Sequence, residues 1–406
     1  MQDQTKGPLS GIRVLELGNF IAAPFAARIF GDFGADVIKI ERPGVGDEIR
    51  GWRRDKGATS MMYRTIARSK RSVTLDLSSP SGQALILDLV REVDVVIENF
   101  RPGTLERWNI GPDQLKEANP DIALVRISGY GQTGPYSERA GFGGVAEAVG
   151  GLRYVTGYPD RQPVRSAAPI GDSLAGLYGA ISALIMLLAR AREGDHAKPA
   201  VADVALHEAV FMAMESLVPD FDAYGTVRER TAGNLPGVVP SGAYACAEGG
   251  SVLIAGNASG VFARLMTAVG RGDLATDPEL ADGRKRYLRE AELDEAITAW
   301  TSVRSPSEVV DGLSAAGVPV GEIFDARRIA EDRHYLERGM IQNFKVEVDG
   351  APEDVRFPGV VPHFDGQSAE VSWLGHELGQ ATDDVLREIL GLDSVAIDEY
   401  RRARVI

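Results

Sequence analysis

Cysteine is almost missing from the 406-residue sequence, because only Cys246 is present. A single cysteine cannot form an intrachain disulfide, and such sparse use is typical of a reducing compartment, so we expect a cytoplasmic location. The five histidines stand apart from one another, and Cys246 has no partner at the spacing of a metal ligand. The sequence therefore predicts no metal site and no metal cofactor.

Positive charge is also scarce, since 44 lysines and arginines face 58 aspartates and glutamates, which gives a formal net charge of −14. A surface that binds nucleic acid needs an excess of positive charge, so we expect no nucleic-acid partner. An anionic small molecule would have to meet a local cluster of basic side chains.

No hydrophobic run is long enough to predict a membrane span. The longest apolar stretch, residues 174–189, is short for a bilayer and contains glycines, which suits a buried helix better. Residues 1–11 are polar and lack the sections of a secretory signal. We expect neither a transmembrane helix nor a membrane partner.

Several nucleotide-binding and catalytic motifs are absent as well. The sequence has no Walker phosphate loop and no Gly-x-Ser-x-Gly elbow, which disfavours ATP-driven activation and serine hydrolysis. Residues 13–41 resemble half of a dinucleotide-binding unit, with the acidic Glu41 where a ribose ligand would stand. The glycines after the first strand lack the spacing that brings backbone close to a pyrophosphate, which disfavours a nicotinamide enzyme.

Alternating strand and helix patterns are what the sequence does contain. They imply a mostly parallel sheet with right-handed crossovers. The expected fold class is α/β, with a Rossmann-like sheet domain and a smaller mixed α/β domain. The strands expected in the sheet are residues 13–17, 35–41, 72–77, 94–99, 122–128 and 200–206.

Composition divides the chain into four segments. Residues 1–222 are assigned to the large α/β domain. Glycine, proline and threonine accumulate without periodicity in residues 228–242, so we interpret residues 223–245 as a linker or active-site loop. Residues 246–340 are assigned to the small domain, and residues 341–406 to a segment that returns to the large domain.

Asp172 is the most informative single residue. It stands in the segment Ile170-Gly171-Asp172-Ser173, at the start of a long helix that is apolar nearly all round. One interpretation is a helix N-cap, since aspartate and serine satisfy the free N–H groups there. The other is a carboxylate nucleophile, which the helix dipole keeps ionised and which nearby N–H donors assist by stabilising an oxyanion. The pattern alone leaves both open.

Seven short motifs follow one another along nearly the whole chain. They are residues 9–17, 34–44, 70–76, 96–103, 129–136, the Gly171-Asp172 pair and residues 317–319. In this order they resemble the family III coenzyme A transferases of the CaiB/BaiF type, of which formyl-CoA transferase is the best-known member. Each motif is weak evidence alone, but the shared order is specific.

The resemblance implies a reaction and an assembly. Members of the family form an interlocked homodimer and move coenzyme A from an acyl-CoA donor to a small carboxylic acid. Asp172 would attack the donor thioester to give a mixed anhydride, which the thiolate would convert into an aspartyl-CoA thioester. The acceptor acid would then form a second anhydride, and the returning thiolate would release the product without ATP or metal.

The resemblance also assigns residues that bind coenzyme A. Arg42, Leu75, Asn99 and Arg107 match positions that contact coenzyme A in the family. The phosphates of coenzyme A need basic partners, so exposed arginines near the sheet are further candidates. On charge and location alone these are Arg71, Arg101 and Arg139.

Two departures from formyl-CoA transferase concern the substrate. Ile21 replaces a glutamine of that enzyme, so we do not expect oxalate or formate and instead suggest a small dicarboxylate such as succinate. The region that corresponds to its glycine loop contains Gly233, Asn234 and Gly237, which are therefore candidates for a loop over the substrate.

Two alternatives share the fold. The α-methylacyl-CoA racemases have a histidine base soon after the Gly-Pro-Tyr motif, whereas this chain has Phe142 in the matching stretch, which cannot exchange a proton. The second alternative is a member that binds coenzyme A without turnover.

Overall fold

The computed structural model describes residues 7–53, 60–193, 200–235, 237–366 and 368–406. Contacts within it divide the chain into two compact units. The larger unit combines the residues up to Leu152 with Ser166–Ser216 and Arg333–Ile406, and the smaller unit combines Arg153–Arg165 with Leu217–Asp332. The sequence-based division assigned Arg153–Arg165 to the large domain, whereas these residues belong to the smaller unit.

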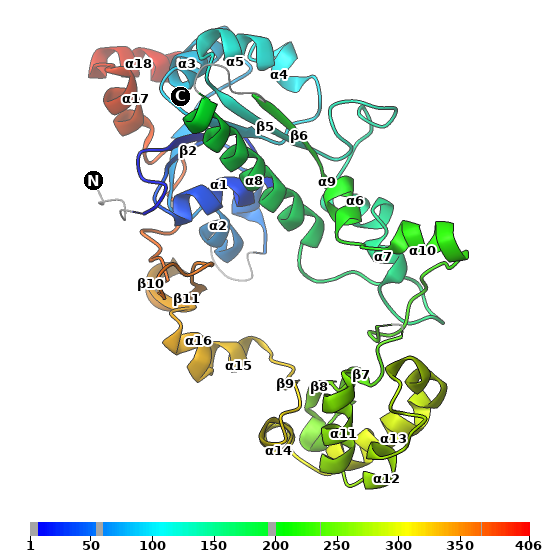
Figure 1. The fold of residues 1–406 in the computed structure, drawn as a ribbon. Coiled ribbons are helices and arrows are strands. Elements are labelled where there is room, and N and C mark those ends of the chain that lie inside the picture. The colour runs from blue at the N-terminus through cyan, green and yellow to red at the C-terminus, as the bar shows by residue number, and fades with distance from the viewer. Residues whose placement is uncertain (1–6, 54–59, 194–199, 236, 367) are drawn as a thin grey trace. The chain divides into compact units, whose positions relative to one another are not determined.

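A six-stranded parallel sheet forms the centre of the larger unit (Figure 1). Its strands are β1 (Arg13–Glu16), β2 (Asp36–Glu41), β3 (Lys70–Thr74), β4 (Val95–Glu98), β5 (Ala123–Ser128) and β6 (Val201–Ala205). They lie in the order β3-β2-β1-β4-β5-β6, and every neighbouring pair is parallel. The expected α/β fold is confirmed, since this is the strand order of a Rossmann domain.

Successive residues of the central strands enter two separate hydrophobic cores, because their side chains alternate between the two faces of the sheet. On one face, Val14 belongs to the core that includes α1 (Ala22–Asp32) and α8 (Ile170–Glu193). On the other face, Leu15 belongs to the core that includes α3 (Pro80–Val90) and α17 (Thr382–Leu390). Both faces are therefore covered, which explains why apolar residues at successive positions of these strands, such as Val14 and Leu15, are all buried.

Helix α8 is long and apolar enough, by length and composition, to cross a membrane. A core helix meets the same criterion, and α8 packs closely within the larger unit. A Cβ atom on Gly176 would lie 2.9 Å from the carbonyl oxygen of Ala22, and one on Gly179 would lie 2.9 Å from a side-chain carbon of Ile127. The absence of a membrane span stays a prediction.

The smaller unit is built on an antiparallel sheet of β7 (Ser241–Ala245), β8 (Ser251–Ala255) and β9 (Val320–Glu322). Its hydrophobic core joins β8 to the surrounding helices. Helix α14 starts with a capping box in which Ser305 and Glu308 exchange hydrogen bonds. The helices of this unit are α10 (Leu217–Tyr224), α11 (Ser259–Ala268), α12 (Gly272–Ala275), α13 (Glu290–Thr301), α14 (Pro306–Ala315) and α15 (Ala326–Glu331), with the 3-10 helices η3 (Ala247–Gly249) and η4 (Gly283–Arg289).

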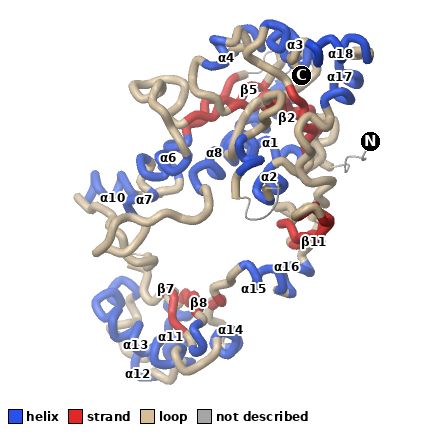
Figure 2. The backbone as a smooth tube through the Cα atoms, turned by 180° about the vertical axis from the view of Figure 1, so that it is seen from behind, coloured by secondary structure: helices blue, strands red, loops and turns tan. Residues whose placement is uncertain are grey.

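The C-terminal segment packs on the larger unit, where α17 and α18 lie beside α3 in both views (Figures 1 and 2). An antiparallel hairpin of β10 (Ile341–Val348) and β11 (Ala351–Pro358) precedes these helices. The remaining helices of the larger unit are α2 (Met61–Ile66), α4 (Thr104–Arg107), α5 (Pro112–Ala118), α6 (Gly143–Val149), α9 (Leu206–Met212), α16 (Arg333–Glu337) and α18 (Ser394–Arg402), with η1 (Glu48–Gly51); α7 (Leu152–Val155) begins at the unit boundary.

A network of buried charges joins β1, β2 and β3 to the loops that follow the first two strands. The ammonium of Lys39 lies 2.6 Å from Glu16 and 2.8 Å from Asp47, and that of Lys70 lies 2.6 Å from the second oxygen of Glu16. All four side chains are almost completely buried. Each charge has an opposite partner, as burial of ions requires.

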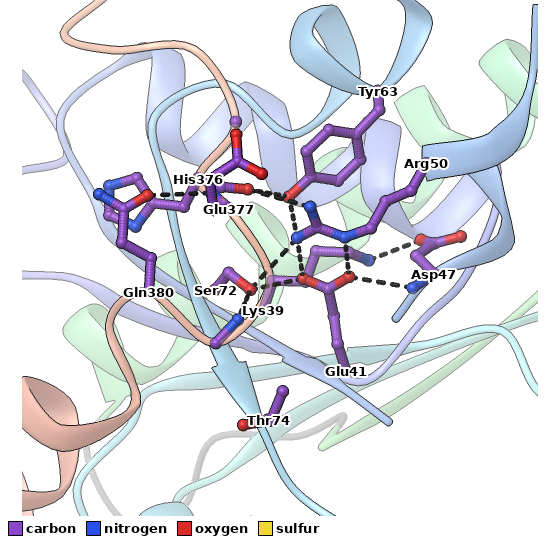
Figure 3. A network of polar contacts seen from close by, with 12 residues as sticks. Lys39, Glu41, Asp47, Arg50, Tyr63, Ser72, Thr74, His376, Glu377 and Gln380 are labelled. Atoms are coloured by element: carbon purple, nitrogen blue, oxygen red, sulfur yellow. Dashed lines mark hydrogen bonds and ion pairs between the residues drawn. The ribbon is translucent and has the colours of Figure 1, made fainter. Parts of the chain in front are cut away.

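Glu41 extends this network at the end of β2 (Figure 3). Both of its oxygens accept hydrogen bonds from Arg50 at 2.7 Å, and Ser72 donates to Oε1 at 2.6 Å. Arg50 also donates to the carbonyl of His376, which ties the C-terminal segment to the sheet. Burial alone would raise the pKa of Glu41, but the hydrogen bonds from Arg50 and the charge of Lys39 outweigh it and lower the pKa to about 2.

We predict that Glu41→Gln destabilises the protein by about 3 kcal/mol at neutral pH, because Arg50 loses its charged partner. The folded state keeps Glu41 ionised, whereas the unfolded chain protonates it near 4.5, so this stabilisation is present above about pH 4.5 and is lost as the pH falls toward about 2. Urea unfolding at several pH values measures the difference between variant and wild type.

The matched control is Asp354→Asn, which removes an exposed ion pair with Lys345. It should change the free energy of unfolding by less than about 1 kcal/mol. The role of the Glu41 charge would be contradicted if the free energies of unfolding of Glu41→Gln and wild type differed by the same amount from neutral pH to about pH 3.

Candidate active site

A cavity of about 230 Å³ opens at the carboxyl ends of the central strands. Leu17 follows β1, Arg42 follows β2, and Leu75 follows β3. The strand order reverses between β1 and β4, which is where parallel α/β sheets bind their ligands. The lining residues are Leu17, Asn19, Ile40, Glu41, Arg42, Gly46, Glu48, Leu75, Asp76, Leu77, Ser78, Phe100 and Trp108.

Two of the four residues that the resemblance assigns to coenzyme A line this cavity, and the other two, Asn99 and Arg107, each directly precede a lining residue in the chain. Arg42 and Leu75 line it, with Arg42 exposed and Leu75 buried. Arg107 is exposed at the end of α4 and directly precedes the lining residue Trp108. Within the described ranges, no carboxylate forms an ion pair with Arg42 or Arg107, so both cations are available to an anionic ligand.

Asn99, the fourth residue, has its amide group engaged by the loop after β1. Its Oδ1 accepts from the N–H of Asn19, and its Nδ2 donates to the carbonyl of Asn19, both at 2.8 Å. A Cβ atom on Gly18 would lie 2.7 Å from this Oδ1. Asn99 therefore fixes the loop that carries the cavity residue Asn19.

The arginines selected on charge and location alone are in three different situations. Arg71 is bound between Asp36 at 2.6 Å and Glu388 at 2.7 Å, and it does not line the cavity. Arg101 is exposed in the loop after β4. The guanidinium of Arg139 stacks on the ring of Tyr136, 3.6 Å from its centroid.

Glu41 stands where a dinucleotide-binding domain presents an acid to the ribose hydroxyls. Besides Arg50 and Ser72, the N–H of Asp47 donates to its Oε2 at 3.0 Å. Each carboxylate oxygen thus already accepts two hydrogen bonds, which leaves little capacity for a ribose. This agrees with the glycine pattern in disfavouring a nicotinamide cofactor.

Asp172 lies inside the first turn of α8, as its third residue, and is partly buried. It is therefore two residues beyond the start, not at the N-cap position that one interpretation gave it. The N–H of Gly171 donates to Oε1 of Glu147 on α6, at 3.4 Å, so a different carboxylate serves the start of this helix. The carboxylate of Asp172 lies against Gly143, where a Cβ atom would be only 2.0 Å from Oδ2.

Three aromatic rings form a cluster in the larger unit. The ring of Phe20 lies 5.2 Å from Trp52 and 5.8 Å from Phe142, centroid to centroid. Phe142 directly precedes Gly143, the residue that contacts the Asp172 carboxylate. Phe20 adopts a left-handed backbone conformation with φ of 64°, and Asp47 accepts from its N–H at 3.0 Å. A racemase would carry its histidine base in this stretch, where this chain has the aromatic Phe142.

The predicted substrate loop belongs to the smaller unit. Gly233 and Gly237 have positive φ values of 103° and 76°, which favour glycine, and Asn234 donates to Glu290 at 3.3 Å. Asn234 and Gly237 line a hollow of about 730 Å³ together with exposed Tyr287.

Sequence reasoning missed Glu147, Gly143 and the cavity residue Trp108. Gly143 and Glu147 are four residues apart, so a helix places them on one face, but nothing in the sequence connects that face to Asp172. Among the residues that the structure describes, no group of three or more His, Cys, Asp or Glu side chains could hold a metal ion. The lack of a metal cofactor stays a prediction.

Comparison with known proteins gives relatives that match over full length. The chain is 42% identical to a succinyl-CoA–D-citramalate CoA-transferase of Chloroflexus aurantiacus, over 98% of either chain. It is 32% identical to a succinate–glutarate CoA-transferase of Agrobacterium fabrum, over 87% of this chain and 89% of that one.

Solved structures show the same fold. A CaiB/BaiF family protein from Brucella suis superposes with a TM-score of 0.82 and 29% identity, covering 95% of this chain and all of that one. The family model described as CoA-transferase family III matches residues 9–382. The resemblance found in the seven motifs is thereby confirmed, and this chain belongs to CoA-transferase family III.

Proposed function

We propose that this protein transfers coenzyme A from succinyl-CoA to a small carboxylic acid, with Asp172 as the nucleophile. The contact between the Asp172 carboxylate and Gly143 carries the proposal, because it presents a carboxylate in the first turn of a long helix beside an apolar wall. The names of the relatives, which act on citramalate, malate or glutarate, support a small dicarboxylic acid as acceptor.

The reaction proceeds by four substitutions at carbonyl carbon. An oxygen of Asp172 attacks the donor thioester, the C–S bond breaks, and coenzyme A leaves as a thiolate from a mixed anhydride. The thiolate attacks the aspartyl carbonyl, which forms an aspartyl-CoA thioester and releases the donor acid. The acceptor carboxylate displaces the thiolate to form a second anhydride. The thiolate then attacks the acceptor carbonyl and regenerates the Asp172 carboxylate.

The protein supplies position and electrostatics for these steps. One thioester replaces another, so the exchange is close to balanced and needs no ATP. The start of α8 favours the ionised form of Asp172 before each attack, through the helix dipole. For the protection of the anhydride and the aspartyl thioester from hydrolysis, we propose that the rings of Phe20, Trp52 and Phe142 cover them when the substrate is bound.

Coenzyme A is proposed to bind at the carboxyl edge of the sheet. Arg42 and Arg107, which form no ion pair with a carboxylate of the described residues, are suited to its phosphates, and exposed Arg101 adds charge nearby in the chain. Leu75 offers an apolar surface in the same cavity. For Arg71 we propose a structural role, since Asp36 and Glu388 occupy its guanidinium. We place the reaction in the cytoplasm on the evidence of cysteine usage.

We predict that Arg42→Gln raises the KM for succinyl-CoA by about tenfold or more and leaves kcat nearly unchanged, because a charge-assisted bond to a phosphate contributes about 1.5–3 kcal/mol to binding. Steady-state kinetics measures both constants. Arg91→Gln, at an exposed arginine that pairs with Asp88, is the control and should change neither. An unchanged KM in Arg42→Gln would remove Arg42 from the cofactor site.

We predict that Asp172→Asn lowers transfer by about a thousandfold or more, since an amide is a very poor nucleophile. The melting temperature should stay nearly unchanged, because Glu147 already serves the start of α8. In the wild type, hydroxylamine added with succinyl-CoA should convert Asp172 to a hydroxamate that peptide mass spectrometry locates.

The control for that substitution is Asp393→Asn at a true helix cap, where Asp393 accepts from the N–H of Ala396 at 2.9 Å. This variant should keep full activity, since asparagine also caps helices. Activity retained by Asp172→Asn, or label on another carboxylate, would refute the nucleophile. Coenzyme A binding without label or turnover would instead establish the non-catalytic alternative.

We also propose a homodimer, as the family resemblance implies. Six large apolar side chains form an exposed stripe along α8 at helical spacing, each between 38% and 59% exposed, which is typical of a protein interface. They are Leu177, Tyr178, Ile181, Leu184, Ile185 and Leu188.

Light scattering should therefore give twice the mass of the chain. Ile185→Glu should shift the protein toward monomer, because a charge would enter the interface. Val395→Glu, at an exposed apolar residue of α18, should not. A monomeric wild type in dilute solution would contradict the dimer.

A further inference from the structure

The start of α8 meets the start of α6 through unusually close contacts. Gly143, the first residue of α6, and Gly171, the second residue of α8, are both buried. A Cβ atom on Gly171 would lie 3.2 Å from the carbonyl oxygen of Gly143 and 3.3 Å from Cγ of Glu147. The two helix starts are therefore close enough that a side chain at position 171 would press on α6.

Gly143 leaves the space that the Asp172 carboxylate occupies. A Cβ atom there would approach Oδ2 to 2.0 Å, Cγ to 2.7 Å and Oδ1 to 3.0 Å. Such distances lie far inside van der Waals contact, and α8 is held from its other sides, for example by Val210 of α9, which lies 3.3 Å from the place of a Cβ on Gly171. Any side chain at position 143 would have to displace the carboxylate.

Glu147 fixes the same helix start from the next turn of α6. Its side chain is 1% exposed, and its Oε1 accepts from the N–H of Gly171, the residue before Asp172. A proline, Pro169, precedes α8 and has no side-chain acceptor for the free N–H groups of the first turn. Glu147 supplies from another helix the acceptor that a local cap would provide.

We infer that Gly143 and Glu147 together form a contact face on α6 that positions the Asp172 carboxylate for attack on the thioester. Gly143 sets where the carboxylate lies, and Glu147 sets where the backbone that carries it lies. Both are positioning residues, since neither is proposed to touch the reacting atoms. The inference rests on the proposed function, because it concerns the nucleophile of that reaction.

The cost of a misplaced nucleophile follows from geometry. A methyl group at position 143 forces the carboxylate to move by about an ångström, and a displacement of that size costs roughly a hundredfold in rate. The coenzyme A cavity is lined by other residues, so binding should be spared. The contact face should therefore govern the rate of acylation and leave affinity unchanged.

The first test compares Gly143→Ala with Gly260→Ala. Gly260 is the second residue of α11, and a Cβ atom there meets only Arg264, at 3.6 Å, so alanine fits. With succinyl-CoA and hydroxylamine, single-turnover labelling of Asp172 should slow by about a hundredfold in Gly143→Ala and stay at the wild-type rate in Gly260→Ala. Calorimetry should give the same Kd for coenzyme A in all three proteins.

The second test uses Glu147. Glu147→Gln keeps an oxygen acceptor for the Gly171 N–H and should label Asp172 at close to the wild-type rate. Glu147→Leu removes the acceptor and should slow labelling by about tenfold or more, again with the Kd for coenzyme A unchanged. Rescue by glutamine distinguishes positioning from a loss of folding, which melting curves report separately.

The outcomes distinguish a failure of the contact face from a failure of the nucleophilic role of Asp172. Labelling of Asp172 at the wild-type rate in both Gly143→Ala and Glu147→Leu would overturn the contact face and leave the nucleophile in place. Equal losses of labelling and of coenzyme A binding would overturn it too, as evidence of general unfolding. A wild-type protein that leaves Asp172 unlabelled would overturn the proposed function, and with it the reason for positioning this carboxylate.

Discussion

The buried ionic network of Glu16, Lys39, Asp47 and Lys70 is the interaction on which the geometry of the sheet edge depends. Charges removed from water are tolerated only in contact with an opposite charge, and each of these has such a contact. Asp47 connects this network to the loops after β1 and β2, because its carboxylate also accepts hydrogen bonds from the N–H groups of Phe20 and Ile49. The loops after β1 and β2 cannot separate without breaking a buried ion pair. These loops supply part of the cavity wall and one ring of the aromatic cluster.

The larger unit contains two separate elements of the proposed site, the carboxyl edge of the sheet and the starts of α6 and α8. The exposed Arg42 lines the cavity at the carboxyl edge of the sheet, although the chain as a whole has a net charge of −14. The starts of α6 and α8 hold a carboxylate against glycine backbone, next to apolar rings. In the proposed reaction the sheet edge binds coenzyme A and the carboxylate of Asp172 reacts, so a Rossmann topology would serve thioester exchange. Glu41, which stands at the position of the ribose ligand in dinucleotide-binding domains, is instead bound by Arg50.

The parallel sheet could be predicted from sequence because its strands, such as Val95–Glu98, are buried on both faces and leave an apolar run. The family resemblance came from motifs such as residues 34–44 and 70–76, and the structure places Arg42 and Leu75 of these motifs in the wall of the cavity. The contact of Gly143 with Asp172 could not be predicted, since it joins two helix starts that only the tertiary packing of α6, α8 and α9 brings together. The hydrogen bonds between the Asn99 side chain and the Asn19 backbone could not be predicted either, because a side-chain amide that binds a distant backbone produces no sequence pattern.

The route of oxygen atoms through the reaction reveals whether Asp172 has a covalent role. The acceptor acid carries oxygen-18 in its carboxylate and is incubated with succinyl-CoA and the protein, after which the protein is digested for mass spectrometry. Attack by the acceptor on an aspartyl thioester, followed by cleavage of the anhydride at the acceptor carbonyl, leaves one labelled oxygen on the enzyme in each turnover. If Asp172 is the nucleophile, oxygen-18 appears in the peptide that contains Asp172. Labelled product accompanied by an unlabelled Asp172 peptide would contradict this role.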